Sequence, residues 1–176
     1  MTGASFDAQI TQRKMSVREA WNKTWDVNVT GTHIMTQTFV PLLLKSSTPR
    51  LLFITSGTAS LEETMDPNSP FGLNMAPKAG WPKEGVFWMP AYRSSKTGMN
   101  MMVREWTRVL KHDGVKVFAI SPGYLATGLG GSVEANKQRG AGDPRLGGEF
   151  IKDVVEGQRD ADAGRAIRRE GKVQPW

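Results

Sequence analysis

Two short apolar runs, separated by one long amphipathic stretch, constrain the fold of this chain most strongly. Residues 50–54, Arg-Leu-Leu-Phe-Ile, and residues 115–120, Val-Lys-Val-Phe-Ala-Ile, each have the length and composition of a buried strand. Between them, apolar residues recur three and four positions apart over residues 99–110, which predicts one face of a helix. The order strand, helix, strand favours a right-handed crossover in a parallel sheet, with functional groups at the carboxyl ends of the strands.

Tyr92 and Lys96 lie four residues apart at the start of this helix, so their side chains are neighbours on one face. An ammonium group within about 4–6 Å favours a phenolate, and we therefore predict a pKa of Tyr92 below its ordinary value of about 10. Such a tyrosine can give and take a proton near neutrality. The pair alone is a weak signal, but Ser56 follows the first strand and Pro122-Gly123 follows the second.

With these groups in this order, the sequence resembles the short-chain dehydrogenase/reductase family. The matching motifs are Asn28-Val29-Thr30-Gly31, Ser56 in Ile54-Thr55-Ser56-Gly57, Tyr92 with Lys96, and Pro122-Gly123 with Thr127. The spacing between Ser56 and Tyr92 is similar to that of carbonyl-reductase-like members. The resemblance implies that Ser56 and Tyr92 hold the substrate carbonyl oxygen and that Tyr92 is the general acid or base.

The resemblance also implies roles for the other matching residues. Lys96 would lower the pKa of Tyr92 and bind the nicotinamide ribose of NADP or NAD, and Asn28 would hold a water molecule in a proton relay. Pro122, Gly123 and Thr127 would lie against the nicotinamide. The implied catalytic set is Asn28, Ser56, Tyr92 and Lys96, and the implied cofactor-binding set is Tyr92, Lys96, Pro122, Gly123 and Thr127.

The resemblance covers residues 1–176 but only a carboxyl-terminal part of a family member. Family members begin with a strand, the turn Thr-Gly-x-x-x-Gly-x-Gly and a helix, and this turn is not in the sequence. We therefore expect a single α/β domain with a partial Rossmann-like three-layer fold, in which a short parallel sheet of about three strands is flanked by long helices. The strand at residues 51–54, central in the family, would then be an edge without a partner.

Three functions remain open at this point. The first is an oxidoreductase that reduces a ketone or aldehyde, or oxidises an alcohol, with NADP or NAD. The second keeps the acid–base residues without a hydride and gives a cofactor-independent isomerase, cyclase or lyase. The third is a non-catalytic remnant that binds a partner. The family also implies a homodimer or larger assembly through the helices that match residues 16–44 and 91–111.

Composition narrows the partners and the kinds of site. The net charge of +6 suits an anionic ligand, but the basic residues are spread along the chain, which argues against nucleic acid. With Cys 0 there can be no disulfide or cysteine metal site, and His33 and His112 are isolated, so we expect no metal. No charged-then-apolar leader and no apolar run near 18 residues are present, which predicts a cytoplasmic protein without membrane spans.

Several local expectations complete the analysis. Residues 1–15 are expected to be a loop, Ser16 and Glu19 form a capping box that starts a helix, and a bend is expected near Thr30-Gly31-Thr32. Residues 146–155 are expected to form a helix and residues 165–168 a last edge strand. The Pro- and Gly-rich segment 57–90 either lines an apolar pocket for a bulky carbonyl compound or is a surface insertion. Its candidate lining residues are Phe71, Leu73, Trp81, Phe87, Trp88 and Met89.

Overall fold

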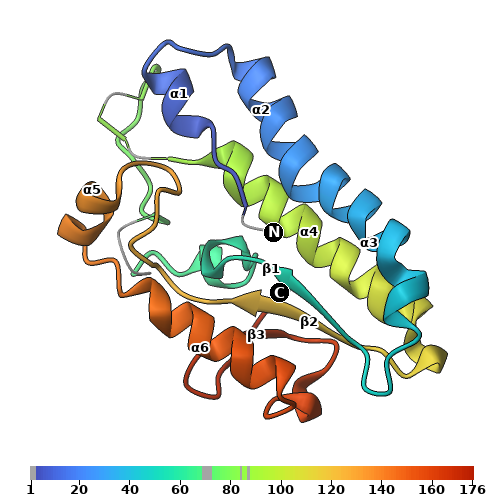
Figure 1. Ribbon diagram of the computed structural model, residues 1–176. Coiled ribbons are helices and arrows are strands. Elements are labelled where there is room, and N and C mark those ends of the chain that lie inside the picture. Colours follow the sequence, from blue (N-terminus) through green and yellow to red (C-terminus); the bar gives the residue numbers. More distant parts are fainter. Residues whose placement is uncertain (1–2, 69–72, 84, 87) are drawn as a thin grey trace.

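The computed structural model has three layers, with a sheet between two sets of helices (Figure 1). It describes residues 3–68, 73–83, 85–86 and 88–176. Helices α2, α3 and α4 lie on one side of the sheet, and α6 lies on the other. This arrangement confirms the expected α/β fold with a short sheet flanked by long helices.

The sheet has the strand order β1-β2-β3-β4. Strands β1 (Arg50–Ile54), β2 (Lys116–Ser121) and β3 (Ala166–Arg168) run parallel, and β4 (Val173–Gln174) is antiparallel to β3. The three parallel strands confirm the sequence expectation. The strand expected at residues 165–168 is confirmed as β3, but it is not the last edge strand, because β4 pairs with its other side. Two residues are too short to show a period-two pattern, which is why β4 was missed.

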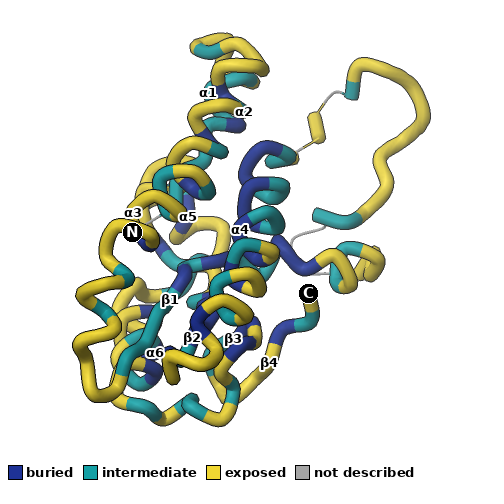
Figure 2. Tube along the Cα trace, turned by 90° about the vertical axis from the view of Figure 1, so that its right-hand side faces the viewer, coloured by how far each residue is buried: buried dark blue, intermediate teal, exposed yellow. Residues whose placement is uncertain are grey.

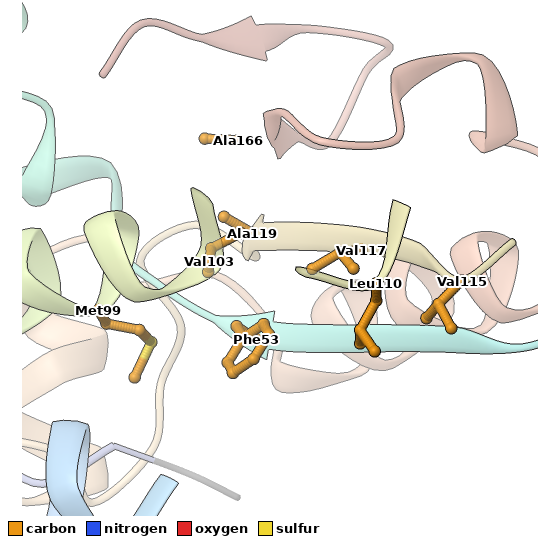
Figure 3. Close-up of a cluster of buried hydrophobic side chains, with 8 residues drawn as sticks. All are labelled: Phe53, Met99, Val103, Leu110, Val115, Val117, Ala119 and Ala166. Atoms are coloured by element: carbon orange, nitrogen blue, oxygen red, sulfur yellow. The ribbon is translucent and has the colours of Figure 1, made fainter. Parts of the chain in front are cut away.

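Strand β2 is buried on both faces and joins two apolar clusters. Side chains alternate between the faces of a strand, so Val117 and Ala119 face α4 (Pro90–Val109) while Phe118 and Ile120 face α6 (Pro144–Val155). A strand covered on both sides reads as a continuous apolar run. The cluster on the α4 side, shown in Figure 3, consists of Phe53, Met99, Val103, Leu110, Val115, Val117, Ala119 and Ala166.

The helices before the sheet begin where the capping signal predicts. The side chain of Ser16 accepts a hydrogen bond from the Glu19 backbone at 3.2 Å, and α2 (Val17–Trp25) follows. A bend was expected near Thr30-Gly31-Thr32; the irregularity found lies just before it, in a π-helical turn, η1 (Asp26–Thr30), which leads directly into α3 (Gly31–Leu43). This irregular turn carries Asn28, which is 1% exposed.

Shorter elements connect these layers. Residues 1–15 were expected to be a loop, but α1 (Asp7–Thr11) lies within them. Helix α5 (Val133–Gln138) precedes α6, whose bounds confirm the expected helix at residues 146–155. None of the helices among the described residues has the length and apolarity needed to cross a bilayer. Further short helical turns in the described part of the chain are η2 (Gly57–Ala59), η3 (Glu63–Met65), η5 (Lys111–Asp113) and η6 (Asp160–Asp162).

Residues 73–83 of the Pro- and Gly-rich segment form an exposed loop that reaches away from the body of the protein (Figure 2). Trp81 is 76% exposed and Trp88 is 57% exposed, and their rings make an edge-to-face contact with centroids 6.3 Å apart. Phe71 and Phe87 lie outside the described residues. Two exposed tryptophans that pack on each other favour the surface insertion over the pocket, because a pocket would cover these rings.

Strand β1 is the first strand of the sheet, and among the described residues it pairs on one side only, with β2. A groove of about 280 Å³ lies along it, between β1 and α3. The expectation of an edge strand at residues 51–54 is therefore confirmed. The lining of the groove is mostly apolar and comprises Thr32, Met35, Thr36, Phe39, Val40, Leu43, Leu51, Leu52, Phe53, Ile54 and Met99.

Candidate functional site

The first turn of α4 carries Tyr92 and is held by a carboxylate from α1. Met89, the residue before α4, makes no side-chain cap, so the first amides of the helix need an acceptor from elsewhere. Asp7 supplies it: Oδ1 accepts from the Ala91 amide and Oδ2 from the Tyr92 amide, each at 3.0 Å. Asp7 is 6% exposed. Its negative charge also lies at the positive end of the helix dipole, which favours this position.

The sequence analysis missed Asp7, which was placed in a loop. A lone acidic residue 84 positions from its partner gives no local pattern. The signal lay at the other end of the contact. Met89-Pro90-Ala91-Tyr92 starts a long helix without Ser, Thr, Asp or Asn at the cap position, and such a helix requires a distant acceptor.

Ser56 and Tyr92 meet at the carboxyl end of β1. The Ser56 side chain lies close enough to the Tyr92 phenol to lower its pKa, and the hydroxyl of Ser56 also lies 2.9 Å from that of Thr58 and accepts from the Thr58 amide at 3.2 Å. Tyr92 is buried, whereas Ser56 is half-buried. A carbonyl oxygen that contacted both hydroxyls would have two donors available.

Burial sets the acid–base behaviour of Tyr92. Desolvation raises the pKa of Tyr92 above its ordinary value, and the hydrogen bond from Ser56 lowers it by a smaller amount. We predicted a lowered pKa from the spacing to Lys96, and this direction was wrong. The spacing is present, with Lys96 Nζ 5.9 Å from the centroid of the Tyr92 ring, but burial of the phenol outweighs it. Tyr92 therefore carries its proton at neutral pH.

Lys96 is 1% exposed and lies beneath the amino-terminal segment. Its Nζ donates to the carbonyl oxygen of Ile54 at 2.7 Å, at the end of β1. A Cβ on Gly3 would lie 2.5 Å from Nζ, so any larger residue at this position would require the Lys96 side chain to shift. Desolvation lowers the pKa of Lys96 to about 8, and at neutral pH most of the molecules still carry the charge.

Asn28 joins the amino-terminal segment to α4. Its Oδ1 accepts from the Ala4 amide at 2.7 Å, and its Nδ2 donates to the Ala4 carbonyl at 2.8 Å and to the Ser95 hydroxyl at 2.9 Å. The side chain of Asn28 therefore fixes backbone on one side and α4 on the other. The role in a proton relay stays a prediction, since these contacts account for the buried amide without it.

The predicted cofactor residues after β2 lie at the same edge of the sheet as Ser56. Ile54 and Ile120 are register partners, so Ser56 and Pro122 each follow two residues beyond a paired position. Gly123 has a φ of +95°, a left-handed conformation that favours glycine. Thr127 lies farther along and is exposed, with its hydroxyl accepting from the Leu129 amide at 3.3 Å. The structure thus joins Ser56, Tyr92, Lys96 and Asn28, and leaves Thr127 at the rim.

The residues present suit one end of a nicotinamide dinucleotide. Hydroxyl donors, an ammonium and the glycine turn at Gly123 gather at one sheet edge, and these are groups that hold a ribose and a flat ring. Lys96 is turned to the Ile54 carbonyl and must leave it to reach a ribose. These groups fit the nicotinamide end, and Tyr92, Lys96, Pro122 and Gly123 are the residues that would hold it, a role that stays a prediction.

Replacing Asp7 tests the cap on α4. We expect Asp7→Ala to lower the free energy of unfolding by about 1–2 kcal/mol, because two buried amides lose their acceptor. Urea unfolding measures the loss, and faster exchange of the Ala91 and Tyr92 amides locates it. The matched control, Asp26→Ala, removes an exposed carboxylate and should change stability by less than about 0.5 kcal/mol. Equal effects of both variants would contradict the assignment.

The lowered pKa of Lys96 predicts a pH-dependent stability. The folded value of about 8 lies below the ordinary 10.5, so the unfolded chain binds more protons between these values and stability rises with pH across that window. Lys96→Met removes this contribution. Urea unfolding at about pH 7.5 and about pH 9.5 should therefore show the wild type gaining stability relative to Lys96→Met. Lys111→Met, at an exposed position, serves as control, and an unchanged difference for Lys96→Met would refute the shift.

The chain is similar in sequence to known dehydrogenases. The profile of the family described as short chain dehydrogenase matches residues 73–138. The chain is 52% identical over 183 residues to the short-chain dehydrogenase/reductase eupG of Phoma sp, covering 99% of this chain and 64% of that protein. It is 48% identical over 164 residues to the short-chain dehydrogenase/reductase tropE of Talaromyces stipitatus, covering 93% of this chain and 61% of that protein.

Two solved structures share the fold. The NADPH-bound carbonyl reductase from chicken fatty liver aligns with a TM-score of 0.66 at 19% identity, covering all of this chain and 64% of its own. The carbonyl reductase Sniffer of D. melanogaster aligns with a TM-score of 0.68 at 17% identity and the same coverage. The chain thus spans less than two thirds of the length of these proteins. In sequence and in fold, the chain is similar to a carboxyl-terminal part of short-chain dehydrogenases/reductases.

Proposed function

We propose that this chain carries the catalytic groups of an oxidoreductase that interconverts a small carbonyl compound, a ketone or aldehyde, and an alcohol with NADP or NAD. The observation that supports this most is that Tyr92 lies beside Ser56 at the end of β1, with the Lys96 ammonium 5.9 Å from the centroid of its ring. Two hydroxyls and an ammonium at one sheet edge suit a reaction in which negative charge develops on oxygen. Because the chain spans only part of its relatives, the activity of the whole protein is part of this proposal.

Each residue has a distinct task in carbonyl reduction. The nicotinamide, when bound, supplies the hydride. Tyr92 holds its proton at neutral pH because burial raises its pKa, so it can donate to the carbonyl oxygen. Ser56 donates a second hydrogen bond to the same oxygen and so keeps it within reach of Tyr92. In the reverse direction Tyr92 must lose its proton, and the nearby ammonium of Lys96 stabilises the phenolate that forms.

The relatives favour this function over the alternatives. A cofactor-independent isomerase, cyclase or lyase, or a non-catalytic remnant, would use the same scaffold. The chain is about half identical to two proteins that are named dehydrogenase/reductases, and no feature of the site favours another reaction. Pro122 and Gly123, with Thr127 at the rim, are the residues that we propose to contact the nicotinamide.

Tyr92→Phe tests the reductase. We expect turnover of NADPH or NADH with a panel of ketones and aldehydes to fall at least about 100-fold, because the proton donor is lost. The matched control is Tyr124→Phe, since Tyr124 is the second of the chain's two tyrosines and is 38% exposed. Tyr124→Phe should keep most of the activity. Unchanged turnover in Tyr92→Phe, or no turnover and no quenching of tryptophan fluorescence by either cofactor in the wild type, would refute the proposal.

We also propose a homodimer through the exposed faces of α3 and α4. These two helices lie side by side in Figure 1 and expose Ile34 by 55%, Leu42 by 59% and Met101 by 63%. Such apolar exposure on adjacent helices is typical of an interface. Light scattering at micromolar concentration should show a dimer, and Ile34→Glu should convert it to a monomer. Leu61→Glu, at a position 63% exposed outside these helices, should leave it dimeric, and a wild-type monomer would contradict the proposal.

A further inference from the structure

The last residues of the chain pack against the loop that carries Ser56. Gln174 in β4 is 2% exposed, and its Nε2 donates to the backbone carbonyl of Ser56 at 3.1 Å. Its Oε1 accepts from Nε of Arg168 at 3.0 Å. An arginine can only donate, so Arg168 fixes which end of the amide faces it. The amide nitrogen of Gln174 is thereby directed at Ser56.

Arg168 is itself held by the same loop. Its Nη1 donates to Glu63 Oε1 at 2.8 Å and its Nη2 to Glu63 Oε2, while Nη2 also donates to the Gly57 carbonyl at 3.4 Å. Arg168 and Glu63 thus form a two-pronged ion pair, which has a strongly preferred geometry. All three nitrogens of the guanidinium are occupied, and the direction of its Nε toward Gln174 is set.

The chain end makes a second contact with this loop. The Trp176 carbonyl accepts from the Glu62 amide at 3.1 Å and from the Ser60 hydroxyl at 3.5 Å. The loop from Ser56 to Glu63 is therefore attached to the tail at both ends. Ser56 is the first residue of this loop. Its backbone carbonyl accepts from Gln174, and its side chain lies beside Tyr92. Because only a few covalent bonds separate the carbonyl from the hydroxyl, the position of one affects the other.

We propose that Gln174 is a positioning residue of the site: its amide, aimed by Arg168, holds the Ser56 backbone so that the Ser56 hydroxyl meets Tyr92. The inference rests on the roles proposed above for Ser56 and Tyr92. It adds β4 and the tail, 118 residues away from Ser56 in sequence, to the structure that sets the active geometry. The Ser56 carbonyl also accepts from the Ala59 amide at 3.1 Å, so without Gln174 it keeps a bond within its own loop but loses its attachment to β4, and Ser56 would be free to turn.

The contact can be read without turnover. The chain has two tyrosines, so incorporation of 3-fluorotyrosine gives two ¹⁹F signals. The signal that disappears in Tyr124→Phe belongs to Tyr124, and the other belongs to Tyr92. Gln174→Met keeps the length of the side chain and removes both hydrogen bonds. We expect the Tyr92 signal to move and its titration midpoint to shift to higher pH, since the Ser56 hydrogen bond lowers the pKa of Tyr92. The Tyr124 signal should stay in place.

A double-mutant cycle separates positioning from general destabilisation. If Gln174 acts through Ser56, then Gln174→Met added to Ser56→Ala should cause no further change at Tyr92. An equal change in both backgrounds, or no change in either, would overturn the proposal. Val173→Thr, at the neighbouring position of β4 that is 42% exposed, is the matched control and should leave Tyr92 unaffected.

Two further measurements keep the outcome decisive. If Gln174→Met does not fold, Gln174→Asn keeps the amide but shortens its reach, and the same cycle is run with it. In turnover assays Gln174→Met should lower kcat about two- to tenfold, as expected for one misplaced hydrogen bond, without weakening cofactor binding. If Tyr92 responds through Ser56 but the wild type shows no turnover, the positioning role stands and the reductase function fails.

Discussion

The packing of α4 on β1 and β2 is the interaction on which the site depends. Met99, Val103 and Leu110 on one face of the helix meet Phe53 and Val117 on the sheet (Figure 3). This cluster fixes the axis of α4 relative to the strand ends. Tyr92 and Lys96 lie about two turns and one turn before it, respectively, on the same helix, so their positions above the end of β1 follow from apolar packing. The acid–base groups are thus placed by the core and not by a mobile loop.

Polar contacts fix the segments around the site that the apolar core does not hold. Each buried polar group of the site bonds to backbone from a distant segment: Asp7 to α4, Asn28 to Ala4, Lys96 to Ile54 and Gln174 to Ser56. Among the described residues, every buried polar side-chain atom has a partner. A buried side chain that loses its partner costs about 1–3 kcal/mol, so these contacts specify one arrangement of otherwise irregular segments.

The sequence predicts best what repeats locally. The strands β1 and β2, the helix start at Ser16 and the grouping of Ser56, Tyr92 and Lys96 follow from periodicity, a capping signal and a family resemblance. The roles of Asp7 and Gln174 were not predicted. Each side chain binds the backbone of a residue more than 80 positions away, and a backbone group can belong to any residue type, so the sequence shows no pattern for such a contact. The prediction of a lowered pKa for Tyr92 was wrong for a different reason. Spacing predicts which charges are near, but the degree of burial follows only from the packed structure.

The contrast between Tyr92 and Lys96 shows how burial shapes the chemistry. Desolvation disfavours the charged form of both groups, so it raises the pKa of the phenol and lowers the pKa of the ammonium. The two pKa values therefore move apart, and transfer of the phenol proton to the lysine amine becomes less favourable. The Ser56 hydrogen bond works against this trend at Tyr92. A ligand that drew Lys96 away from the Ile54 carbonyl toward Tyr92 would work in the same direction, because a closer ammonium favours the phenolate. The proton affinity of the site is therefore coupled to the position of one side chain, which the end of β1 now holds.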